Sequence, residues 1–100
     1  MKPREIEILA KPGTDVDRKF REIFLGEEHH VKMVGEEALL YPVTKRGVVY
    51  DRADFYIVTG LKLDNIHVKL LEYILNHSTW CLRNLILLAP TPADNNEETQ

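Results

Sequence analysis

The sequence has 100 residues, of which 44% are hydrophobic and 29% are charged, and its formal net charge is -3. A chain of this length and composition is expected to fold as one domain rather than to stay disordered. The negative charge argues against a dedicated nucleic-acid-binding protein, because such proteins need Lys and Arg side chains to neutralise phosphates. Cys81 is the only cysteine, so no disulfide can form within the chain, and no apolar run is long enough to span a bilayer. We therefore expect a cytoplasmic domain without membrane contact.

Residues 5–10 alternate charged and apolar side chains, which is the pattern of a half-buried β-strand. On such a strand, Ile6 and Ile8 face the core and the glutamates face solvent. Pro12 and Gly13 come next and predict a loop, because both residues interrupt regular structure.

Residues 16–25 are predicted to form a helix of about three turns. Thr14 or Asp15 can serve as its N-cap, and Gly26 is suited to end it. One side of this helix carries apolar residues at helical spacing, namely Val16, Phe20, Ile23 and Phe24.

The next segment is predicted to form a β-hairpin. Residues 31–34 and 38–43 have strand character, and residues 35–37 between them resemble a turn. Pro42 has no N–H to donate, so the second strand should lie at a sheet edge or end there.

A further β-region follows a turn at residues 44–47. Residues 48–50 and 55–59 have the β-branched and aromatic content of strands. The charged segment between them, residues 51–54, is either a bulge or a second hairpin turn.

Residues 64–76 are predicted to form the second helix, with Asp64 as its N-cap. Apolar residues repeat at helical spacing and predict a core-facing stripe made of Ile66, Leu70, Leu71, Ile74 and Leu75. Truncating Leu70 or Leu71 to alanine is therefore expected to cost about 2–5 kcal/mol.

The last apolar run, residues 80–89, suits either a helix or a central strand, and we favour the strand. Residues 91–100 are polar and contain two prolines, so we expect a disordered acidic tail after a single domain of residues 1–90. The predicted fold is α+β, with the order β-α-β-β-β-α-β. It has a mixed sheet of about four to five strands and two helices packed on one face.

The candidate chemistry is sparse. The histidines, His29, His30, His67 and His77, lack the spacing that places two ligands on one side of an element. Cys81 lies in an apolar run, where a thiol is inert. We therefore expect no catalytic residue, no metal and no cofactor. The alternative is a nucleic-acid-binding or metal-dependent, nuclease-like domain that uses Asp51, Asp54 and Lys62, because carboxylates hold Mg²⁺ in such sites.

Four residues are the predicted partner-binding residues: Tyr41, Lys45, Arg46 and Tyr56. Lys45 and Arg46 lie at a predicted hairpin tip, and tyrosines are enriched at interaction surfaces. If the helices cover one sheet face, the other face exposes apolar residues such as Leu39, Tyr41, Tyr56 and Val58, depending on the strand register.

The sequence thus predicts a small non-enzymatic protein that binds another protein, with weak or no nucleic-acid binding. A homodimer is an alternative use of the same surface. In general character the chain resembles the small accessory proteins with which viruses and mobile elements inhibit or modulate host machinery. That likeness is one of type and carries no residue across.

Overall fold

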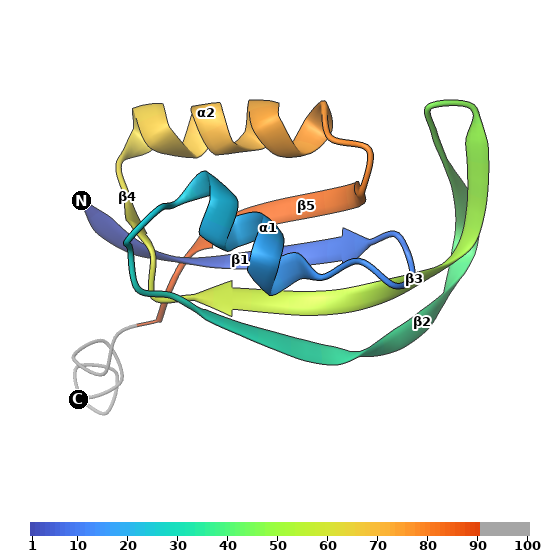
Figure 1. Ribbon diagram of the computed structural model, residues 1–100, viewed down its shortest axis with the longest axis horizontal. Helices are drawn as coiled ribbons and strands as arrows, with labels where there is room; N and C mark the ends of the chain where they lie inside the picture. The colour runs from blue at the N-terminus through green and yellow to red at the C-terminus, as the bar shows by residue number, and fades with distance from the viewer. Residues whose placement is uncertain (91–100) are drawn as a thin grey trace, which may run out of the picture.

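The computed structural model describes residues 1–90, and the predicted tail at residues 91–100 lies outside the described residues. The elements in chain order are β1 (Lys2–Ala10), α1 (Val16–Ile23), β2 (His30–Lys45), β3 (Val48–Thr59), β4 (Lys62–Leu63), α2 (Asn65–Asn76) and β5 (Cys81–Leu88). The predicted α+β class is confirmed, and the last apolar run is the strand that we favoured. The observed order also reads β-α-β-β-β-α-β, but β2 combines the two predicted strands of residues 31–34 and 38–43, and β4 was not predicted. Figure 1 shows α1 crossing in front of β1, while α2 runs beside β5.

All strand pairs in the sheet are antiparallel, so the prediction of a mixed sheet is wrong. The order is β2-β3-β1, with β5 on the other side of β1 and β4 beside the start of β1. α1 connects β1 to β2, and these two strands run in the same direction with β3 between them. α2 connects β4 to β5, which also run in the same direction, with β1 between them. No two parallel strands are therefore neighbours in the described sheet. This is the split β-α-β arrangement called ferredoxin-like, which hosts many functions and specifies none.

The predicted hairpin turn at residues 35–37 is wrong, because β2 runs through this segment as one strand. Gly35 instead lies opposite Phe55, next to a register shift in β2. The reversal occurs at Arg46 and Gly47, whose φ angles of 50° and 80° are typical of a two-residue hairpin loop. Gly35 thus accommodates an irregularity within a strand rather than a turn.

The expected interruption at residues 51–54 is also absent, since β3 is continuous from Val48 to Thr59. The irregularity lies in its neighbour, where Ala38 pairs with Arg52 and Val43 pairs with Tyr50. Residues 39–42 therefore lie opposite Asp51 alone and form a bulge. The bulge includes Pro42, and β2 is the terminal strand of the sheet, as predicted for a proline-containing strand.

The core lies between one sheet face and the two helices, as the sequence predicted. Alternate residues of β1, namely Ile6, Ile8 and Ala10, are fully buried in one cluster with Val16 and Phe20 of α1 and Leu71 and Leu75 of α2. Because side chains alternate between the two faces of β1, its apolar positions all lie on the face that the helices cover.

Asp side chains cap both helices. Asp15 accepts a hydrogen bond from the Arg18 backbone N–H at 3.1 Å, and Asp64 accepts one from the His67 N–H at 2.9 Å. The hydrogen bonds from the backbone and imidazole of His67 lower the pKa of Asp64.

α1 ends at Ile23, two residues before the predicted end, so Leu25 lies beyond the helix and is exposed.

Candidate functional site

Lys45 and Arg46, two of the predicted partner-binding residues, are engaged within the domain. Lys45 Nζ donates to the Asn76 carbonyl at 2.7 Å, and Arg46 Nη2 donates to the His77 carbonyl at 2.6 Å. Those carbonyls end α2, where basic side chains complement the helix dipole. Figure 1 shows the tip of the β2–β3 hairpin turned back toward this end of α2. The two cations therefore join the hairpin to the helix.

The two predicted tyrosines lie in different environments. Tyr41 is exposed in the β2 bulge, next to Leu40, whose exposed fraction is 85%. Tyr56 packs against the helix-covered core, and its hydroxyl donates to the Thr14 carbonyl at 3.1 Å. Burial raises the pKa of Tyr56, and the carboxylates of Asp54 and Asp15 add to this effect. The four predicted residues therefore do not form one surface.

The carboxylates and lysine of the nuclease-like alternative are also far apart. Asp54 pairs with Ala10 at one end of β1 and Lys62 with Pro3 at the other, which is about 23 Å at 3.3 Å per residue. Asp54 is buried and accepts a hydrogen bond from the Gly13 N–H at 3.0 Å. Asp51 is exposed opposite the β2 bulge. Within residues 1–90, no three His, Cys, Asp or Glu side chains are arranged to hold a metal ion.

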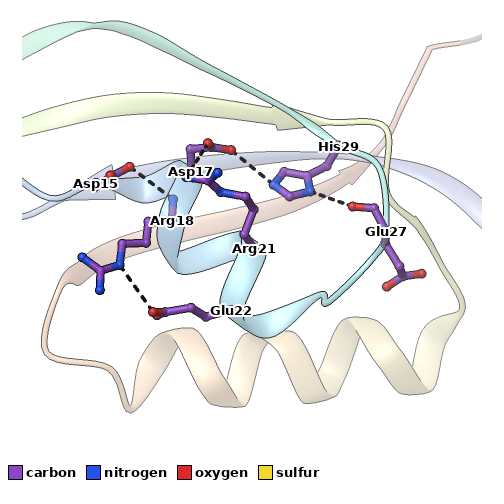
Figure 2. A network of polar contacts seen from close by, with 7 residues as sticks. All are labelled: Asp15, Asp17, Arg18, Arg21, Glu22, Glu27 and His29. Atoms are coloured by element: carbon purple, nitrogen blue, oxygen red, sulfur yellow. Dashed lines mark hydrogen bonds and ion pairs between the residues drawn. The ribbon is translucent and has the colours of Figure 1, made fainter.

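His29, one of the four histidines without metal-ligand spacing, has its side chain buried against Phe20 of α1. Its Nδ1 lies 3.1 Å from the Glu27 carbonyl, and its Nε2 lies 3.5 Å from a carboxylate oxygen of Asp17 (Figure 2). Asp17 also pairs with Arg21 at 3.2 Å along the same helix. These contacts attach the loop before β2 to α1, so we assign the network a structural role.

The sheet face opposite the helices is called the open face below. It consists of the outward residues of four strands, namely Glu5, Glu7, Leu9, Lys32, Phe55, Ile57, Arg83, Leu85 and Leu87. Leu85 and Leu87 are 52% and 38% exposed on it. A depression of ≈ 330 Å³ on this face is lined in part by Glu7, Phe55 and Leu85.

The residues that the sequence placed on the open face are not all there. Val58 is fully buried and Tyr56 packs with it on the helix-covered face, because Val58 pairs with the inward-facing Ile6. Phe55 and Ile57, the neighbours of Tyr56, take the outward positions instead. The segment is apolar throughout, so its sequence had no alternation that could identify the outward residues.

α2 presents a second exposed apolar surface, which we call the outer stripe. Ile66, Leu70 and Tyr73 are 76%, 54% and 61% exposed, so the prediction that Ile66 and Leu70 belong to the core is wrong. Only Leu71 and Leu75 are fully buried on this helix. Beside the stripe, a groove of ≈ 280 Å³ separates α2 from the end of α1, with Phe24, Leu70 and Ile74 among its lining residues.

We expect the Cys81 thiol to be unreactive at neutral pH. Burial raises the pKa of Cys81 from 9.0 to about 11, so its thiolate fraction below pH 9 falls by about 100-fold. Because the folded state retains the proton, stability should fall as the pH rises from 9.0 towards about 11. Alkylation by iodoacetamide, followed by mass spectrometry across this range, checks the expectation. Rapid labelling of the folded chain at pH 7 would contradict it.

No protein-family model matches the sequence, and no curated protein matches it either. Among the helices of residues 1–90, none is long and apolar enough to cross a membrane.

Proposed function

We propose that this chain acts by binding another protein through its open face. The observation that carries the proposal is a pair of apolar columns on one sheet face, one on each side of β1. The exposed Leu85 and Leu87 form the column on β5, and the half-buried Phe55 and Ile57 form the column on β3. Solvated faces of antiparallel sheets are usually polar, and apolar side chains gathered there are typical of binding surfaces. The depression of ≈ 330 Å³ on the same face gives a partner side chain a place to enter.

The central column of the open face, on β1, is acidic, while the basic residues Lys32 and Arg83 lie on other strands of the same face. Glu7 pairs with Leu85 on one side and with Ile57 on the other, so a carboxylate lies between two apolar columns. Glu5 continues this acidic column along β1, opposite Leu87. Across residues 1–90, no ion pair involves Glu5 or Glu7. The arrangement fits a protein segment that presents a Lys or Arg side chain between apolar side chains.

From the sequence pattern we further propose that the chain works as a non-enzymatic inhibitor or modulator in the cytoplasm, in the manner of viral accessory proteins. The separation of Asp54 from Lys62 and the internal use of Lys45 and Arg46 both favour protein binding over the nucleic-acid alternative.

Affinity capture with matched variants tests the proposal. Tagged full-length chains are incubated with lysate of the source cells, with and without nuclease, and bound proteins are quantified by mass spectrometry. We expect the wild type to retain a stoichiometric partner that both Glu7→Lys and Leu85→Glu lose. Glu22→Lys on α1 and Leu40→Glu in the bulge make the same chemical changes at exposed positions away from the open face. These two controls should retain the partner.

Two results would contradict the proposal. One is that the open-face variants retain the same proteins as the controls. The other is that recovery disappears on nuclease treatment, which would favour nucleic-acid binding. Circular dichroism of every variant separates lost binding from lost folding.

A further inference from the structure

The groove between α2 and the end of α1 supports an inference that is independent of the open face. We propose that this groove binds a free α-amino acid that has an apolar side chain. Its volume of ≈ 280 Å³ is close to the lower end of ligand pockets, which usually measure about 300–1,000 Å³. The size of the groove therefore suits a ligand of few atoms.

The walls of the groove are mainly apolar. α2 contributes Leu70, Leu71 and Ile74, and the end of α1 contributes Ile23 and Phe24. Leu71 is buried in the core, and Ile23 and Phe24 pack against that core while part of their surface stays exposed. An apolar side chain that enters between the helices therefore exchanges water for apolar contacts on both sides, and this exchange favours binding.

Two side chains of opposite charge also line the groove, namely Glu27 in the loop after α1 and Lys62 on β4. Neither of them forms an ion pair within residues 1–90. One charge of each sign beside apolar walls is complementary to a zwitterion that carries an apolar side chain. In an α-amino acid, the ammonium group would face Glu27, the carboxylate would face Lys62, and the side chain would lie between the helices.

The main chain holds both charged residues at the groove. The Glu27 N–H donates to the Phe24 carbonyl at 3.3 Å, and the Glu27 carbonyl lies 3.1 Å from His29 Nδ1. Figure 2 shows the Glu27 carboxylate turned away from His29 and towards α2. Lys62 is positioned by the pairing of β4 with Pro3 at the start of β1. The side chains of Glu27 and Lys62 therefore remain to adjust to a ligand.

The lining also indicates how the ligand is oriented along α2. β4 directly precedes α2, so Lys62 lies at the start of that helix, where His67 also lines the groove. Ile74 lies about 10 Å further along the helix than His67, at 1.5 Å per residue. The imidazole of His67 is already hydrogen bonded to Asp64, so we assign the carboxylate of the ligand to Lys62. The apolar side chain of the ligand then points towards Ile74.

NMR titration of the isotope-labelled full chain with L-leucine and with L-phenylalanine tests the proposal. We expect a dissociation constant on the order of 0.1–1 mM for at least one of them, with shifted amide resonances in the residues that line the groove. Three relatives of leucine should bind at least about 10-fold more weakly. They are isocaproate, which lacks the amino group, isoamylamine, which lacks the carboxylate, and serine, which lacks the apolar side chain.

Two variants connect each charged group of the ligand with its residue. Lys62→Gln should weaken the binding of leucine by about 10-fold but leave that of isoamylamine unchanged, because isoamylamine has no carboxylate. Glu27→Gln should weaken the binding of leucine by about 10-fold but leave that of isocaproate unchanged, because isocaproate has no amino group. Glu28→Gln and Lys69→Gln, the same changes at exposed positions outside the groove, should bind leucine as wild type does.

Three results would overturn the proposal. The first is that neither amino acid shifts the resonances of the groove residues at up to about 10 mM. The second is that isocaproate and isoamylamine bind as tightly as leucine, because the groove would then be a general apolar site. The third is that the same resonances shift with protein concentration alone, which would place a second copy in the groove. The spectrum of each variant without ligand shows whether that variant is folded.

Discussion

Phe20→Ala should lower the free energy of unfolding by about 3–5 kcal/mol, the range found when buried aromatic side chains are truncated. Phe20 is fully buried at the meeting point of α1, the loop before β2 and the start of β5. Its ring centroid lies 6.1 Å from that of Phe24, 6.2 Å from that of His29 and 6.4 Å from that of Trp80. Removing the ring therefore leaves a cavity that three aromatic neighbours cannot fill by small movements.

Urea unfolding followed by far-UV circular dichroism measures this loss. Trp80 fluorescence is less suitable, because it will change with the missing neighbour as well as with unfolding. A small domain has only about 5–15 kcal/mol of stability, so the variant should be partly unfolded at 37 °C. Leu25→Ala, at an exposed position just after α1, should stay within about 0.5 kcal/mol of wild type. A loss below about 1.5 kcal/mol for Phe20→Ala would mean that the core is packed differently.

Leu71→Ala and Leu70→Ala should differ sharply although the two residues are neighbours. Leu71 is 1% exposed and Leu70 is 54% exposed, so only the substitution Leu71→Ala removes a side chain from the core. We expect a cost of about 2–5 kcal/mol for Leu71→Ala and less than about 1 kcal/mol for Leu70→Ala. The comparison also checks how α2 is rotated about its own axis. Equal costs for the two substitutions would contradict the placement of Leu70 on the outer stripe of α2.

Several features of the fold were predictable because they depend on residues close together in the sequence. Charged and apolar residues alternate between Glu5 and Ala10, and this is sufficient to identify β1 and its buried face. Asp15 and Asp64 precede apolar residues at helical spacing, so both helix starts were predicted. The same local patterns placed strands within residues 31–43, 48–59 and 80–89, but they divided β2 in two and did not identify β4.

The interaction surfaces were less predictable. Residues 66–75 carry apolar side chains around much of α2, so periodicity alone did not separate Leu71, which packs in the core, from Leu70, which does not. The groups that Lys45 and Arg46 bind, the carbonyls of Asn76 and His77, lie 31 residues further along the chain, and no local pattern indicates this contact. The sequence therefore did not indicate that Lys45 and Arg46 bind groups inside the domain.

The sequence by itself determined β1 and the starts of both helices, because periodicity and capping act over a few residues. Only the tertiary structure decided that β2 is one strand with a bulge, that Phe55 and Ile57 face outward, and that β1 separates β4 from β5. Strand register is selected by burial against distant elements, and a shift of one residue moves every side chain to the opposite face. Where a segment is apolar throughout, that choice is absent from its local sequence and is made when the sheet and helices pack together.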